Sequence, residues 1–157
     1  MKHCKIIAAL SIVMVLMSSL AYGAMKTADF ALLCSKGSPQ EIKNALDSGN
    51  KPTEQILITA AYSNPNPEVI NLLLSSAQRY GLDFKKMKVT GAGILNSAIR
   101  GGRAGIVRAV MSFGVNVNSK DKRGVSPLSE ALRYGYKSEE PERHEIIRIL
   151  REAGARR

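Results

Sequence analysis

Side chains that could take part in catalysis are few in this chain of 157 residues. Beyond the first 23 residues, Cys34 is the single cysteine and His144 the single histidine. A catalytic nucleophile needs a neighbouring base, and a Cys/His metal site needs several ligands. His144 lies among charged residues, a pattern typical of a solvated helix surface, whereas Cys34 takes a small-residue position that favours a buried thiol, with an intermolecular disulfide as the alternative. We therefore expect no enzyme, no metal and no cofactor.

Binding chemistry is better represented, because the chain carries 23 basic against 13 acidic residues, a net charge of +10. The run Gly91-Ala92-Gly93 is interpreted as structural, since the Lys-Ser/Thr pair of a phosphate-binding loop does not follow it. A large positive charge attracts anionic partners over a long range, and salt weakens that attraction. The residue types favour binding of an acidic macromolecule over catalysis.

Residues 1–23 have the composition of an export signal. Lys2 and Lys5 precede an apolar run from Ile6 to Met17, and small residues follow from Ser18 to Gly23. The run is shorter than the ~20 residues that cross a bilayer as a helix, so we expect cleavage at the end of this segment, with an uncleaved anchor as the alternative. Cleavage leaves 21 basic and 13 acidic residues, a net charge of +8. The expected location is periplasmic or secreted.

The elements that would position the binding residues recur along the chain. A pattern of apolar-x-x-small, with Gly or Asn four residues after the small position, starts at Phe30, Leu57, Leu95 and Leu128, at intervals of 27, 38 and 33 residues. A second segment with apolar residues four apart follows each copy, and this spacing places them on one face of a helix. The second segments are 42–46, 69–74, 106–111 and 146–150. The repetition predicts four helix pairs.

Helix start and stop signals lie at the ends of these segments. Ser38-Pro39-Gln40-Glu41 combines a capping Ser, a Pro at the first helical position and a Glu three residues after the Ser. Asn66-Pro67 and Ser126-Pro127 repeat the order of cap and Pro. Glycines suited to a left-handed helix end follow the second segments, at Gly49, Gly81, Gly114 and Gly154. These signals predict an all-α protein with little room for strands.

The clearest copy resembles the ankyrin repeat. Gly124 to Gly135 is similar to the signature Gly-x-Thr-Pro-Leu-His-x-Ala-Ala-x-x-Gly, and Phe113 to Asn118 to the Gly-Ala-Asp-Val-Asn turn. Residues 93–118 form the next best copy, the first two copies are degenerate, and the resemblance covers about 29–155. It implies an ankyrin-type helix-turn-helix repeat solenoid with short finger loops. The expected organisation is a signal peptide at 1–23 and a repeat domain at 24–157, with repeats at approximately 28–52, 53–89, 90–122 and 123–157.

Several positions depart from the ankyrin pattern. Ile58, Asn96 and Ser129 replace its His, which predicts that the usual side-chain hydrogen bond is absent and that the loops are looser. Repeat two is lengthened around 75–80 and repeat four carries an insertion near 136–143, each being either decoration or a means of recognition. Polar residues on the terminal repeats fit capping roles. These are Lys43, Asn44 and Asp47 in repeat one, and Arg148, Arg151 and Glu152 in repeat four.

The resemblance implies a concave partner-binding surface made of the fingers and the exposed positions of the first helices. Basic residues surround apolar and aromatic ones there, a mixture typical of binding hot spots. The alternative for each single residue is a solvated loop tip, with Phe84 tucked under a neighbouring repeat. The expected partner-binding residues are Lys36, Tyr62, Phe84, Lys85, Lys86, Met87, Lys88, Arg100, Lys120, Lys122, Arg123, Arg133 and Tyr134.

The same resemblance implies a scaffold that holds a protein. The excess of basic residues favours a partner with an acidic surface, and the chain is expected to be a monomer. The alternatives are a basic adaptor on an anionic envelope polymer or membrane surface, and a secreted effector. Nucleic acid is not expected as a partner, because the sequence has no nucleic-acid-binding motif and export would separate the protein from cellular nucleic acid. Membrane contact is expected only through an uncleaved leader or peripheral charge. Binding by charge alone should collapse in salt, whereas an interface with apolar anchors should persist.

Overall fold

The computed structural model describes residues 25–133 and 140–157; the expected leader at 1–23 and Tyr134 lie outside these ranges. Within them all regular secondary structure is helical, which confirms the all-α prediction. No helix of the described ranges is both long and apolar enough to span a membrane. The helices are α2 (Thr27–Lys36), α3 (Pro39–Asp47), α4 (Glu54–Ser63), α5 (Pro67–Arg79), α6 (Lys88–Gly101), α7 (Ala104–Ser112), α8 (Pro127–Arg133) and α9 (Glu140–Glu152).

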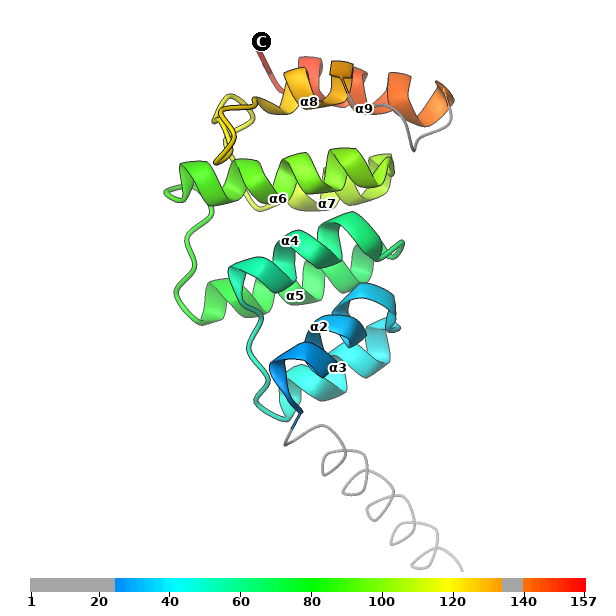
Figure 1. Ribbon diagram of the computed structural model, residues 1–157, viewed down its shortest axis with the longest axis vertical. Coiled ribbons are helices and arrows are strands. Elements are labelled where there is room, and N and C mark those ends of the chain that lie inside the picture. The colour runs from blue at the N-terminus through cyan, green and yellow to red at the C-terminus, as the bar shows by residue number, and fades with distance from the viewer. Residues whose placement is uncertain (1–24, 134–139) are drawn as a thin grey trace, which may run out of the picture.

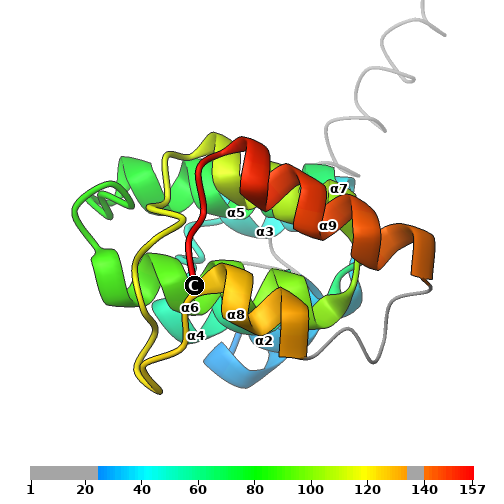
Figure 2. The ribbon, with the colours of Figure 1, turned by 90° about the horizontal axis from the view of Figure 1, so that it is seen from above.

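The helices form four stacked pairs arranged in two layers. Figure 1 shows the pairs α2/α3, α4/α5, α6/α7 and α8/α9 following one another along the long axis. Seen from above in Figure 2, the first helices of the pairs make one layer and the second helices make the other. Accordingly, α2 contacts α4, α4 contacts α6 and α6 contacts α8 in the first layer, and α3 contacts α5, α5 contacts α7 and α7 contacts α9 in the second. The predicted helix-turn-helix solenoid is confirmed, with fingers before the first helices at one edge and tight turns at the other.

The helix ends have the predicted local chemistry. The backbone N–H of Ser38 donates to Glu41 Oε2 at 2.8 Å while the N–H of Glu41 donates to Ser38 Oγ at 3.4 Å, a reciprocal cap. Asn66 Oδ1 accepts the N–H of Glu68 at 2.9 Å at the start of α5. The glycines after the second helices all have left-handed φ angles: 90° at Gly49, 92° at Gly81, 78° at Gly114 and 79° at Gly154. These boundaries were predictable because each depends on a few consecutive residues.

The core is formed where the pairs stack. The apolar stripes of the second helices are buried, with Ile42, Val69, Leu73 and Leu150 fully inaccessible to solvent. Cys34 is buried as predicted, and this burial raises the pKa of its thiol to about 12. A single helix pair covers only one face of each helix, so the neighbouring pairs complete the core.

Buried polar side chains also connect successive pairs. Asn64, which is 1% exposed, donates from Nδ2 to the carbonyl oxygens of Cys34 at 3.0 Å and Gly37 at 3.1 Å. Arg103 donates to the carbonyl oxygen of Tyr62 at 3.2 Å. These bonds satisfy carbonyls at the ends of α2 and α4, which lack partners within their own helices. They connect the second pair to the first and the third pair to the second.

One prediction about the ankyrin His position is wrong. Asn96, fully buried on α6, donates from Nδ2 to Asp121 Oδ2 at 3.0 Å and to the carbonyl oxygen of Val125 at 2.9 Å. A side-chain hydrogen bond to the following finger is therefore present, and this finger is held at two points. The expectation of a looser loop failed because the amide of Asn can donate twice. Ile58 has no donor, and its side chain lies in a pocket described below.

The terminal and lengthened regions follow the expectation only in part. Lys43 and Asp47 on α3, and Arg151 on α9, are exposed as the capping role requires. Leu32 on α2 is 58% exposed, so the outer side of the first pair is not wholly polar. The extra length of repeat two is helix, because α5 has 13 residues against 9 in α3 and 9 in α7. Residues 140–143 of the insertion open α9, and its earlier part lies outside the described residues.

Candidate partner-binding surface

The expected first-helix residues occupy equivalent positions in successive repeats. Lys36, Tyr62, Arg100 and Arg133 lie in the last turns of α2, α4, α6 and α8. These helices stack in one layer, with their C-terminal ends at the edge opposite the fingers (Figure 2). The four residues, being in the last turns, therefore follow one another along that edge. Lys36 and Arg133 are exposed, while Tyr62 and Arg100 are half-buried. The row and the fingers are therefore the two edges of one surface.

Phe84 was expected as an apolar anchor, and the structure corrects this. Its side chain is 1% exposed and meets the ring of Phe113 edge-on, with centroids 6.2 Å apart and an interplanar angle of 89°. Burial under the neighbouring repeat, the stated alternative, is the observed arrangement. Met87, at the N-cap of α6, is half-buried. The aromatic ring of this finger stabilises its position and is not available to a partner.

The three lysines of the same finger are exposed. Lys86 pairs with Asp83 at 3.4 Å, but its side chain remains 86% exposed, so the pair is weak. The aliphatic stem of Lys85 packs closely against Gly114: a Cβ added at that glycine would lie only 2.9 Å from Lys85 Cε. Lys88 is the first residue of α6. We call Lys85, Lys86 and Lys88 the basic finger.

The finger before α8 is organised around Asp121. Its side chain is 7% exposed and accepts hydrogen bonds from the side chains of Asn96 and Arg123 and from the backbone N–H groups of Arg123 and Val125. Burial opposes the charge, but the hydrogen bonds outweigh it and lower the pKa of Asp121 to about 2. Asp121, which is charged at neutral pH, thus holds this finger together through hydrogen bonds.

A buried carboxylate joins two of the expected binding residues. Glu130 on α8 has no exposed side-chain surface; Arg123 Nη2 lies 2.9 Å from its Oε2, and Arg100 Nε lies 3.3 Å from its Oε1. Arg100 also donates from Nη2 to Ser97 Oγ at 2.9 Å. Arg100 and Arg123, from different elements, are therefore brought together, but as internal partners. Sequence reasoning missed Glu130, although an acidic residue beside the core position Ala131 was a visible signal.

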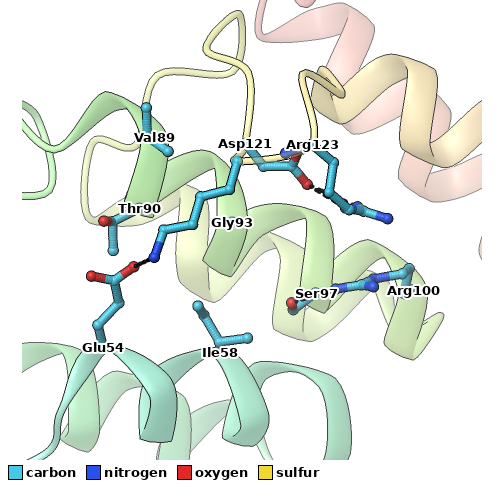
Figure 3. A pocket seen from close by; sticks show the side chains of 10 residues that line it. Glu54, Ile58, Val89, Thr90, Gly93, Ser97, Arg100, Asp121 and Arg123 are labelled. Atoms are coloured by element: carbon cyan, nitrogen blue, oxygen red, sulfur yellow. Dashed lines mark hydrogen bonds and ion pairs between the residues drawn. The ribbon is translucent and has the colours of Figure 1, made fainter.

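A pocket of about 220 Å³ lies between α4, α6 and the finger around Asp121 (Figure 3). Ile58 and Glu54 reach it from α4, and Val89, Thr90, Gly93 and Ser97 from α6 (Figure 3). Lys122 crosses one side, where its Nζ lies 3.4 Å from Glu54 Oε1. The remaining lining residues are Arg100, Asp121 and Arg123.

The charges around this pocket balance. Glu54, Asp121 and Glu130 face Arg100, Lys122 and Arg123 through the pairs given above. The expected basic character of the surface therefore does not extend to its centre. Among the expected binding residues away from this pocket, exposed positive charge is found on the basic finger and on Lys36, Lys120 and Arg133.

The candidates for chemistry are far from being assembled into a site. Among the described residues no three His, Cys, Asp or Glu side chains are grouped as a metal site would require. His144 is exposed on α9, whereas Cys34 is buried in the core. These two residues do not meet.

Stacked helix pairs with projecting fingers define a helical repeat protein. A family model described as ankyrin repeats, in three copies, matches residues 57–156, well over half of the chain. The chain belongs to the ankyrin-repeat family. Such repeats generally mediate protein–protein interaction and are typically non-enzymatic scaffolds. Comparisons with curated proteins and with solved structures gave no significant match.

The family match starts at Leu57, within α4, and so leaves out the first helix pair. That pair joins the array through its packing: α2 contacts α4, and α3 contacts α5, as in the later repeats. The degenerate first copy is thus a structural repeat with little of the family signature.

Proposed function

We propose that this chain is an exported, non-catalytic, monomeric scaffold that binds an acidic partner protein through its fingers and first helices. Membership of a family of protein-binding repeats supports the scaffold role. The observation that carries the acidic partner is the basic finger, whose three lysines lie exposed at one edge of the surface.

The basic finger has features that folding does not require. Lys88 occupies the first turn of α6, which has no acidic residue. The N-terminus of a helix carries partial positive charge, so a cation there is unfavourable by about 0.3–1 kcal/mol. Lys86 has a partner that is itself half-exposed. An acidic surface docked against this finger would neutralise charge that the chain itself leaves largely unbalanced.

Charge reversal with a matched control tests this role. Lys85→Glu, Lys86→Glu and Lys88→Glu are combined in one variant, and Lys43→Glu, Arg79→Glu and Arg151→Glu in another that lies on the second-helix layer. Each variant changes the net charge equally. Proteins captured from an envelope extract are identified and their affinities measured. Loss of one defined protein from the first variant alone supports the proposal, and equal capture by all forms removes the basic finger from it.

The control also separates the alternative, a basic adaptor for an anionic polymer or membrane surface. Binding by overall charge should weaken equally in both variants and collapse in several hundred millimolar salt. That outcome would replace the protein partner with a polymer or a lipid surface.

Export is supported by the sequence of residues 1–23, with its two lysines, apolar run and small residues before the expected cleavage point. Fractionation of cells and determination of the N-terminus test it. A protein that starts at Ala24 in the envelope or medium is expected. A full-length chain retained in the cytoplasm would refute export.

A further inference from the structure

The pocket between α4, α6 and the finger around Asp121 is a feature that the basic finger does not explain. We propose that it receives one apolar side chain from the partner protein, which gives the interface an apolar anchor beside its charged edge. This inference rests on the proposed function, since it concerns the same surface.

Aliphatic side chains line the pocket on two of its sides. Ile58, at the position where the family pattern has His, turns its side chain into the pocket from α4 (Figure 3). Val89, on α6, lies across the pocket from Ile58. It is 46% exposed, one of the few large apolar side chains of the described residues that face solvent to this degree. Covering apolar surface of this kind with a partner favours binding, because it removes that surface from water.

Two glycines of α6 differ in what their missing side chains allow, and the comparison shows that helix packing does not require a glycine at the pocket. A Cβ at Gly91 would lie 3.2 Å from Val115 Cγ1 and 3.4 Å from the carbonyl oxygen of Phe84, so this glycine permits a close approach of the chain. A Cβ at Gly93 would meet only Ile58 Cδ1, at 3.9 Å, which is ordinary contact. Glycine within a helix lowers the stability of that helix relative to alanine. At Gly93 no close packing accounts for that cost, and the missing side chain keeps the pocket open.

The size and charge of the pocket define its occupant. About 220 Å³ is below the roughly 300–1,000 Å³ of small-molecule sites, so a single side chain suits it better than a separate ligand. The surrounding carboxylates and cations are paired with one another, which leaves no net charge to attract an ion. An apolar centre within a paired polar rim is the arrangement found at interface hot spots.

The experiment compares two substitutions at Gly93 that affect folding and binding differently. Gly93→Ala improves helix propensity and narrows the pocket, and Gly93→Leu fills it. Asn71→Ala, on the exposed side of α5, also improves helix propensity and serves as the matched control. The protein is produced with its own leader and purified after export.

The probe is N-acetyl-leucine-N′-methylamide, followed by amide NMR shifts, with the aspartate analogue as comparator. We expect saturable shifts at Thr90, Gly93 and Ser97 for the leucine compound, retained in about 0.5 M NaCl because apolar contacts are not screened. Binding should weaken at least about tenfold in Gly93→Leu and stay unchanged in Asn71→Ala. Gly93→Ala should unfold at a higher temperature yet bind less tightly. Absence of saturable shifts, identical binding by Gly93→Leu, or preference for the aspartate compound would overturn the inference.

Failure of this inference differs from failure of the proposed function. If the leucine probe does not bind but charge reversal of the basic finger still abolishes capture of a defined protein, the pocket is removed and the scaffold stands. If the probe binds as expected while charge reversal changes nothing, the acidic partner is refuted and the apolar anchor remains.

Discussion

Glu130→Ala is the most direct test of the ion network between α6, α8 and the finger before α8. The substitution removes a carboxylate with no exposed side-chain surface and leaves Arg100 and Arg123 in place. Glu130 does not line the pocket itself, although both of its arginine partners do. We expect the array to unfold more easily.

The magnitude follows from the exposure of the two arginines. Removing one partner of a buried ion pair costs about 3–5 kcal/mol when the other charge stays buried. Here the Arg100 and Arg123 side chains are 36% and 43% exposed, so both guanidinium groups can be hydrated after the change. Arg123 also keeps its bond to Asp121 at 2.8 Å. The expected cost is therefore the loss of charge-assisted contacts, about 1–3 kcal/mol.

Urea unfolding followed by far-UV circular dichroism measures this free energy. Glu152→Ala is the control, because Glu152 on α9 also pairs with an arginine but its side chain is 58% exposed. Its loss should change stability by less than about 0.5–1 kcal/mol. A double-mutant cycle of Glu130→Ala with Arg123→Ala then gives the coupling between the two residues. If Glu130→Ala costs no more than the control, or the coupling is zero, the network is not a source of stability and our reasoning is wrong.

Further expectations concern the core, the finger and the thiol. Leu73→Ala, at a fully buried position, should cost about 2–5 kcal/mol in urea unfolding, and no loss would contradict the stacked core. Gly101→Ala should lower the melting temperature, because a Cβ there would lie 2.7 Å from the carbonyl oxygen of Tyr62. The pKa of Asp121 is lowered from 3.8 to about 2, so its contribution to the free energy of unfolding is complete above pH 3.8 and is lost as the pH falls toward 2. Asp121→Asn should therefore flatten the dependence of stability on pH across that window. An unchanged dependence would exclude Asp121 as its source. Cys34, buried and with its pKa raised to about 12, should react with a thiol reagent only at the rate of unfolding, and rapid labelling of the folded protein would place it at the surface.

The fold was largely predictable, because its signals are short in sequence. The reciprocal cap of Ser38 with Glu41 spans four residues, and Gly154 needs only its own left-handed backbone to end a helix. The helical spacing of Ile42 and Leu46 likewise identifies a buried face without knowledge of what covers it. Local rules of this kind gave the number and order of the helix pairs.

The binding surface was less predictable, because its character depends on distant contacts. Phe84 looked like an exposed anchor among lysines, yet Phe113, far along the chain, buries its ring. Arg100 and Arg123 looked like free cations until Glu130 placed them together. The pocket at Gly93 requires that α4 and α6 be stacked, which spacing alone does not show. Residue type predicted which side chains could bind, and tertiary structure determined which remain free to do so.

The stacking of the helix pairs has a consequence for how such a chain evolves. The principal contacts of each pair are within itself and with the pairs beside it, and α2 and α8 lie in the pairs at opposite ends of the stack (Figure 1). A duplicated unit inserted between two others would meet the same kind of neighbouring face, and loss of a unit would bring two compatible faces together. Duplication or deletion of a short coding segment therefore changes the reach of the molecule without redesign of its interior.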